Sequence, residues 1–128
     1  MINFDNGCIE LDTEFDLIPN SEFEKFKKSK YYSNQNEKYI VEIEGLHRIC
    51  GKEFFVSLVF QNSKLKQVCL MMSSSQILDF ADELNRKIIH DKFLAEIRMS
   101  DNNNFEWGNI VSEFDRKSCI SSIIFSYN

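Results

Sequence analysis

Two strand-like segments separated by a short polar turn constrain the fold more than any other feature of this chain. "KEFFVSLVF" spans residues 52–60 and "KLKQVCLMM" spans residues 64–72, with Asn62–Ser63 between them. Both are rich in β-branched, aromatic and long apolar residues, as strands are. A connection this short predicts an antiparallel hairpin. The first segment is apolar on both faces, which favours a central position in a sheet.

A further strand is expected before this hairpin. Residues 38–44, "KYIVEIE", alternate so that Tyr39, Val41 and Ile43 share the better-buried face. Residues 45–51 are expected to form the loop that leads into the hairpin. Three consecutive strands with short connections predict an antiparallel meander.

A second hairpin is expected near the C-terminus. "FEWGNIVSEF" and "CISSIIFSY" flank the turn "DRKS", in which the Asp115 carboxylate can hydrogen-bond the backbone two residues on. Gly108 indicates a bulge or a close approach of another backbone. The single tryptophan, Trp107, fits either core packing or an interface anchor.

Two segments show helical periodicity. In "PNSEFEKFKKSKYY", Ser21 is expected as the N-cap with Glu24 as its capping-box partner. Phe23 and Phe26 share the apolar face of this helix. The second segment, residues 73–97, carries an apolar stripe behind a serine N-cap. The stripe consists of Ile77, Phe80, Ala81, Leu84 and Ile88.

The stripe of the second helix shifts along the segment. It continues at Phe93, Leu94 and Ile97, which predicts a kink or a second helix near His90–Asp91. The following "SDNNN" is expected to be a polar loop.

These signals together predict a single α+β domain over residues 1–128. We expect an antiparallel-dominated sheet of five to seven strands with helices packed on one face. The composition, 43% apolar and 27% charged, is ordinary for a globular protein and permits a sizeable core.

The N-terminal segment has an unusual charge pattern. A turn is expected at Asn6–Gly7, and the next residues, "CIELDTEFDL" (8–17), alternate apolar and acidic side chains. In one extended strand the four carboxylates would share one face about 7 Å apart and repel one another. They belong to Glu10, Asp12, Glu14 and Asp16. A charged outer face that discourages aggregation and a docking surface for a basic partner both explain such a row.

The net charge is concentrated in the same region. The formal net charge is -5; residues 1–20 hold five acidic residues and no Lys or Arg, whereas residues 21–128 are balanced. Binders of nucleic acid and of anionic membranes normally carry the opposite sign, so we expect neither as a partner. "KFKKSKYY" (25–32) mixes bases and aromatics as RNA contacts can, but a solvated helix end also explains it.

The start of the chain and its cysteines predict a cytoplasmic protein. "MINFDNGCIELD" lacks the basic and apolar regions of a secretory signal peptide, and no apolar run reaches membrane-spanning length. Cys8, Cys50, Cys69 and Cys119 are scattered and form no CxxC pair. We expect free thiols, with Cys69 and Cys119 inside strands.

No motif in the chain names a reaction. His47 and His90 are the only histidines, and no cysteine lies in a known nucleophile signature. "HRIC" places His47 and Cys50 three residues apart, which is half of a zinc ligand set without a matching pair. In that loop Ile49 or Cys50 is expected to point inward. We therefore expect no catalytic centre, no metal site and no cofactor.

The C-terminal segment "WGNIVSEFDRKSCISSIIFSY" resembles a signature of small stand-alone bacterial proteins: Trp-Gly, a strand, Asp-x-Lys, and a serine-rich strand of isoleucines ending in Tyr. The early "DNG", the central "FFVSLVF…KLKQVCL" hairpin and "HDKFL" extend the likeness over most of the chain. Proteins of this size and make-up are similar to immunity proteins of bacterial toxin systems, including contact-dependent inhibition. Where related tails often have Gly in the final turn, this chain has Ser118 and Cys119.

The resemblance implies a toxin inhibitor that acts by binding. Its partner would be a cognate toxin domain, expected to be a basic nuclease because nuclease sites attract phosphate. The residues expected to contact the toxin are Glu10, Asp12, Glu14 and Asp16, with Phe15 as an aromatic anchor.

Two alternatives stay open. One is a small-ligand-binding protein or an enzyme of unknown reaction that uses His47 or His90 as a base in a pocket. The other is a structural subunit, a homodimer that pairs through an edge strand such as "CISSIIFSY".

Overall fold

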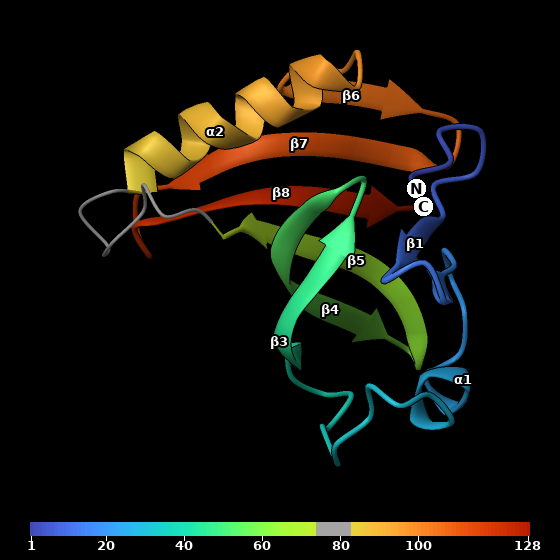
Figure 1. Ribbon diagram of the computed structural model, residues 1–128. Coiled ribbons are helices and arrows are strands. Elements are labelled where there is room, and N and C mark those ends of the chain that lie inside the picture. Colours follow the sequence, from blue (N-terminus) through green and yellow to red (C-terminus); the bar gives the residue numbers. More distant parts are fainter. Residues whose placement is uncertain (74–82) are drawn as a thin grey trace.

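The chain forms a twisted antiparallel sheet with helices packed on one face, which confirms the predicted α+β class (Figure 1). The computed structural model describes residues 1–73 and 83–128. The elements in chain order are β1 (Ile9–Leu11), β2 (Phe15–Leu17), α1 (Phe23–Lys27), β3 (Val41–Ile49), β4 (Lys52–Gln61), β5 (Lys64–Met72), α2 (Glu83–Glu96), β6 (Asn102–Phe105), β7 (Gly108–Asp115) and β8 (Ile120–Tyr127). The main sheet has the order β3-β4-β5-β8-β7-β6, and β1 and β2 form a separate two-stranded sheet.

Two-residue turns with left-handed backbone set the register of the β3–β4–β5 meander. Asn62 and Ser63, between β4 and β5, have φ angles of 53° and 64°. Cys50 and Gly51, between β3 and β4, have φ angles of 51° and 78°. Such turns match the right-handed twist of paired strands. The predicted meander is confirmed, and β4 is an inner strand.

β3 is longer than its sequence pattern indicates. The predicted loop over residues 45–51 is wrong, because a bulge between Ile43 and His47 lets the strand continue. Tyr39 lies before the strand and is 72% exposed, so its predicted burial is also wrong. Val41 and Ile43 are buried as predicted.

The predicted C-terminal hairpin is confirmed as β7–β8. The Asp115 carboxylate accepts a hydrogen bond from the Lys117 N–H at 2.9 Å in its turn. A Cβ on Gly108 would lie 1.8 Å from the carbonyl oxygen of Ser126, which is the predicted close backbone approach. Cys119 lies in the turn, not in a strand. β8 is an inner strand, so the edge-strand dimer through "CISSIIFSY" is contradicted.

The "SDNNN" segment is an edge strand for most of its length. Asn102–Phe105 pair with β7, so the predicted loop is wrong there. The Ser100 hydroxyl donates to the Asn102 carbonyl at 2.9 Å and accepts the Asn102 N–H at 3.3 Å. These bonds occupy backbone groups that a strand edge would otherwise leave open.

α1 is short and begins differently from the prediction. Its N-cap is Glu22 without a side-chain cap, and the Ser21 backbone is engaged elsewhere: its carbonyl accepts the Leu65 N–H of β5, and its N–H donates to the Ile18 carbonyl. Phe23 and Phe26 are buried as predicted.

α2 is a continuous helix through His90–Asp91, so the predicted kink is wrong. Leu84 and Ile88 are 62% and 64% exposed, so their predicted apolar stripe does not face the sheet. The earlier stripe residues and the serine N-cap lie outside the described residues; they are Ile77, Phe80 and Ala81 with the serines at 74 and 75. No helix in residues 1–73 or 83–128 combines the length and apolarity needed to cross a membrane.

Polar side chains attach α2 to the sheet. The Nε2 atom of His90 accepts the Met72 N–H of β5 at 2.9 Å, and His90 is fully buried. The Glu83 carboxylate accepts the Ser121 N–H of β8 at 2.9 Å. These sheet N–H groups require acceptors, which explains why the buried side of α2 carries polar residues.

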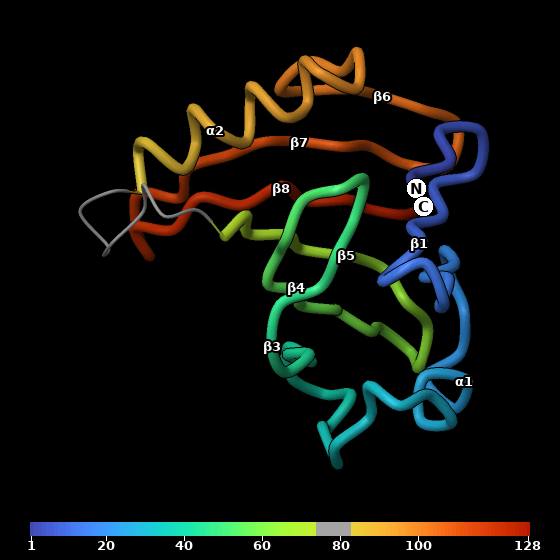
Figure 2. The backbone as a smooth tube through the Cα atoms, viewed as in Figure 1, coloured from blue at the N-terminus to red at the C-terminus, as the bar shows by residue number. Residues whose placement is uncertain are grey.

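Trp107 is a packing residue that holds the N-terminal segment against the end of β8. Its Nε1 donates to the Phe4 carbonyl at 2.8 Å, and the Tyr127 hydroxyl donates to the Gly7 carbonyl at 2.9 Å. Gly7 has a φ of +81°, and a Cβ there would lie 2.7 Å from the Trp107 ring. Figure 2 follows the N-terminal segment (blue) past the end of β8 (red) towards β1.

Candidate functional site

The acidic segment is a hairpin, not one strand. β1 and β2 pair antiparallel with Leu11 opposite Phe15. The chain reverses at Asp12–Thr13, whose φ angles are 55° and 57°. The predicted single row of four carboxylates is therefore wrong. The hairpin divides them into two groups, Glu10 with Asp16 and Asp12 with Glu14.

Glu10 and Asp16 form a like-charge pair on the hairpin. They lie directly opposite each other in the β1–β2 register. The Glu10 carboxylate is 3.7 Å from the Met1 ammonium in an exposed contact of the weak kind. Among the described residues, Asp16 forms no ion pair. Like charges directly opposite destabilise a hairpin.

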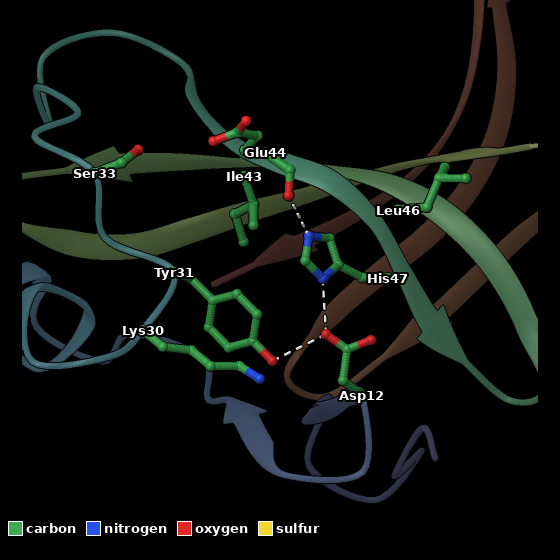
Figure 3. A pocket seen from close by; sticks show the side chains of 8 residues that line it. All are labelled: Asp12, Lys30, Tyr31, Ser33, Ile43, Glu44, Leu46 and His47. Atoms are coloured by element: carbon green, nitrogen blue, oxygen red, sulfur yellow. Dashed lines mark hydrogen bonds and ion pairs between the residues drawn. The ribbon is translucent and has the colours of Figure 1, made fainter.

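The Asp12 carboxylate turns toward the protein and contacts three donors, of which Figure 3 shows Tyr31 and His47. Its Oδ1 accepts the Arg48 N–H at 2.7 Å. Its Oδ2 lies 2.7 Å from His47 Nδ1 and 3.0 Å from the Tyr31 hydroxyl. Burial raises the pKa of Asp12, but these hydrogen bonds outweigh burial and the net pKa is lowered. Asp12 is therefore a charged group that is satisfied within the chain.

His47 is held between two acceptors. Its Nδ1 faces the Asp12 carboxylate, and its Nε2 lies 2.9 Å from the Glu44 carbonyl oxygen. The side chain is only 10% exposed. His47 thus contacts Asp12 in a part-buried site, and both of its ring nitrogens face partners within the chain.

Tyr31 packs beside this contact between His47 and Asp12. Its ring centroid is 5.3 Å from that of His47 and 5.4 Å from that of Phe15. The Lys30 ammonium pairs with the Glu14 carboxylate and lies 5.4 Å from the centre of the Tyr31 ring. Burial and the bond to Asp12 raise the pKa of Tyr31, which keeps its hydroxyl protonated. Phe15, the predicted anchor, is half-buried against Tyr31.

These side chains line a pocket of about 340 Å³. In Figure 3, Tyr31 and Lys30 form one side and Ile43 and Glu44 the opposite side. The volume is within the range of small-ligand pockets. The complete lining is Asp12, Lys30, Tyr31, Ser33, Ile43, Glu44, Leu46 and His47.

The same contacts cover the outer edge of β3. The Arg48 N–H donates to the Asp12 carboxylate at 2.7 Å, and the Arg48 carbonyl accepts the Asp12 N–H at 2.9 Å. The Glu44 carbonyl accepts from His47, and the Glu42 carbonyl accepts from Gln35 at 3.1 Å. An edge strand with its polar groups occupied is a poor template for another strand. The cluster therefore closes this end of the sheet.

Sequence reasoning missed the link between Asp12, Tyr31 and His47. The three residues come from a turn, the segment after α1 and a bulged strand, and no periodic pattern relates them. His90 lies elsewhere, on the buried side of α2. In the part of the chain that the structure describes, no cluster of three or more His, Cys, Asp or Glu side chains could hold a metal ion.

Comparison with known proteins yields no relative: no family model matches the chain, and no curated protein and no solved structure is significantly similar to it.

Proposed function

We propose that this protein is a binding module of the immunity type, which captures and neutralises a cognate toxin domain through its acidic hairpin. The observation that carries the proposal is the pair Glu10 and Asp16, which face each other across β1 and β2 as like charges. A hairpin does not need this arrangement to form, and it costs stability. A Lys or Arg side chain of a basic partner would relieve the repulsion on binding.

The position of the net charge supports the same reading. Residues 1–20 hold five acids and no bases, while residues 21–128 are balanced. A local excess of one sign steers an oppositely charged partner to that place and raises the association rate. A basic nuclease domain is the partner class that this field would select.

The carboxylates of the hairpin take different roles within this proposal. Glu10 and Asp16 contact the partner directly. Asp12 positions the hairpin through its contact with His47, and Glu14 is shared between Lys30 and an incoming cation. Phe15 contributes through its exposed part while its ring packs on Tyr31.

The bonding of the two histidines favours binding over a histidine-based reaction. Both nitrogens of His47 face acceptors, and Nε2 of His90 is occupied by the Met72 N–H in a fully buried position. A general base requires an unoccupied nitrogen within reach of substrate.

A second candidate function is small-ligand binding in the pocket beside Tyr31. Its volume of about 340 Å³ and its mixed lining favour this reading. A metabolite panel screened by thermal denaturation should then reveal a ligand that raises the Tm. The substitution Leu46→Arg, at a pocket wall residue that is 41% exposed, should abolish that rise.

The decisive experiment is capture of the partner by the tagged protein from its native host at low and high salt. The captured protein is then purified, and its binding is measured as a function of salt concentration. We expect one basic partner whose affinity falls steeply as salt rises.

Two matched double variants locate the contact. Glu10→Gln with Asp16→Asn should weaken binding about tenfold, mainly through a slower association rate. Glu96→Gln with Glu106→Gln changes the net charge equally at exposed sites elsewhere and should bind like the original protein. Equal loss in both variants, or no partner at either salt, would contradict the proposal.

A further inference from the structure

The pocket beside Tyr31 holds a carboxylate without a counter-charge in the part of the chain that the structure describes. Glu44 of β3 lines this pocket, is exposed, and forms no ion pair with the described residues. The other carboxylate of the lining, Asp12, is occupied by donors from Arg48, His47 and Tyr31. Glu44 therefore gives the pocket a negative charge that is available to a ligand.

A cation already lies against the aromatic wall of this pocket. The Lys30 ammonium is 5.4 Å from the centre of the Tyr31 ring, which is the geometry of a cation–π contact. Lys30 also pairs with the Glu14 carboxylate, and its side chain is 64% exposed. An exposed ion pair of this kind is weak, so the Lys30 side chain can move aside. The Tyr31 wall thus accepts a positive charge, which Lys30 supplies from within the chain.

Apolar side chains line the pocket close to the Glu44 carboxylate. In Figure 3, Ile43 lies next to Glu44 and across the pocket from the Tyr31 ring. Leu46 belongs to the same lining and is 41% exposed. Methylene groups pack on such a surface while a charged head stays at a polar group, as the stems of Lys and Arg do. The lining therefore fits a charged head on an apolar stem.

The charges around the pocket select a cation over an anion. An anion would meet the carboxylates of Glu44 and Asp12, and it would have to draw Lys30 away from Glu14. The neighbouring N-terminal segment adds to the negative field, because residues 1–20 hold five acidic residues and no Lys or Arg. A cation instead finds an uncompensated carboxylate and an aromatic ring in one pocket.

Building on ligand binding in this pocket, the second candidate function, we propose that the pocket takes an organic cation: an ammonium or guanidinium group on an apolar stem. The head pairs with the Glu44 carboxylate, and the stem packs against Ile43, Leu46 and the Tyr31 ring. A guanidinium is the better head, because it is planar and can donate two parallel hydrogen bonds to one carboxylate. Lys30 is an internal competitor that lowers the affinity.

Two sources can supply this cation. One is a free amine or guanidine, and the other is an arginine side chain of the protein partner. Asp12 lies both in the turn of the acidic hairpin and in the lining of the pocket, so a protein that docks on the hairpin also reaches the pocket. Arginine is enriched among the anchor residues of protein interfaces. The chemistry of the head and stem is the same for both sources.

A matched pair of small ligands tests the charge preference. The full chain is titrated with butylguanidinium and with butylurea at constant ionic strength, and binding is followed by NMR chemical shifts. The two molecules have nearly the same shape, but only the first is charged. We expect butylguanidinium to bind at least about tenfold more tightly than butylurea. Equal affinities, or no binding of butylguanidinium, would overturn the proposal.

Three variants at exposed positions test the assigned residues. Glu44→Gln should weaken the binding of butylguanidinium about tenfold. Glu42→Gln is the matched control, because it removes the same charge outside the pocket and should leave the affinity unchanged. Lys30→Gln should strengthen binding about threefold, since it removes the competing cation from the Tyr31 ring. Circular dichroism checks that each variant is folded.

The same variants show which results contradict the cation assignment. Equal affinities in Glu44→Gln and Glu42→Gln would overturn the role of Glu44. Loss of binding in Lys30→Gln would mean that the pocket takes an anion, which overturns the proposal. A neutral or anionic metabolite that raises the Tm while butylguanidinium does not bind would keep the ligand-binding function and overturn its cationic ligand.

Competition with the captured protein partner separates the two sources. If the partner supplies the cation, butylguanidinium should displace the partner, and butylurea at the same concentration should not. If the cation is a free compound, the partner and butylguanidinium should bind together. Both results support the cation site, and the second shows that it is separate from the surface that captures the partner.

Discussion

The Nδ1 atom of His47 lies 2.7 Å from the Oδ2 atom of Asp12, which ties the turn of the acidic hairpin to the edge strand of the main sheet. The contact joins residues far apart in the chain and is largely shielded from solvent, with the two side chains 10% and 25% exposed. The hairpin that presents Glu10 and Asp16 is thereby held in a fixed position on the sheet.

Removing the charge of Asp12 should destabilise the fold. Asp12→Asn replaces one acceptor oxygen of the carboxylate that bonds Arg48, His47 and Tyr31 with an amide group that cannot accept, so the free energy of unfolding should fall by about 2 kcal/mol. Urea denaturation measures the change. Asp16→Asn is the matched control, since it makes the same chemical change at an exposed residue and should not lower stability. Equal losses in both variants would show that the His47 contact contributes nothing.

Stability should fall in mild acid because of His90. Burial, then the nearby Arg86 and Lys87 charges, lower the pKa of His90 from 6.5 to about 4, although Asp91 partly opposes them. The unfolded chain therefore binds the proton first, so the stability contribution is complete above pH 6.5 and is lost as the pH falls toward 4. The expected loss is about 3 kcal/mol.

Urea denaturation at a series of pH values measures this loss. His90→Gln keeps an acceptor for the Met72 N–H without a titrating ring, so its profile between these pH values should be flatter. The Asp12 contribution is a separate one, because its pKa is lowered and it is lost only in stronger acid. An unchanged profile in His90→Gln would assign the acid sensitivity to another group.

Gly7 should be harder to replace than Gly45, although both have a left-handed backbone. Gly7→Ala combines a left-handed φ of +81° with a Cβ placed 2.7 Å from the Trp107 ring, and should cost about 3 kcal/mol. Gly45→Ala is the control, because Gly45 has a similar φ of +85° but open space around its Cβ. Its cost should be about 1 kcal/mol. Urea denaturation monitored by Trp107 fluorescence gives both values. Equal costs would mean that the Trp107 ring moves aside for the added Cβ without a loss of stability.

The four free cysteines should differ in reactivity. Cys50 and Cys119 are exposed, whereas burial raises the pKa of Cys69 to about 11. Only the thiolate reacts, so a disulfide reagent at mildly alkaline pH should label Cys50 and Cys119 in a fast phase and Cys69 slowly. The variant Cys50→Ser with Cys119→Ser should lose the fast phase. A fast labelling phase that remains in this variant would show that a third thiol is accessible in the native protein.

Local patterns predicted most of the main sheet. The β4–β5 and β7–β8 hairpins follow from alternating side chains and their turn residues, which act over a few residues only. Failures occur where tertiary contacts override local preference. The bulge in β3 depends on His47 reaching Asp12, and β6 forms because β7 offers it a partner edge.

Only the types of residue in the candidate site could be predicted from the sequence, not their arrangement. An acidic row and two histidines are visible in the sequence, but the hairpin turn at Asp12–Thr13 uses left-handed backbone that these residues adopt only occasionally. α2 illustrates the same limit. Leu84 faces outward and His90 faces inward, because His90 supplies the acceptor that the Met72 N–H of β5 requires. The amphipathic periodicity of the helix contains no information about this hydrogen bond to the sheet.

The position of β8 has a consequence for biosynthesis. β8 follows the other described strands in the chain, yet it is the strand that joins β5 to β7. On the ribosome the β3–β4–β5 meander and the β6–β7 hairpin therefore exist as two separate pieces, each with an open edge. Insertion of β8 between them closes both edges in one step, so the two pieces stay open to wrong pairing until β8 has been made.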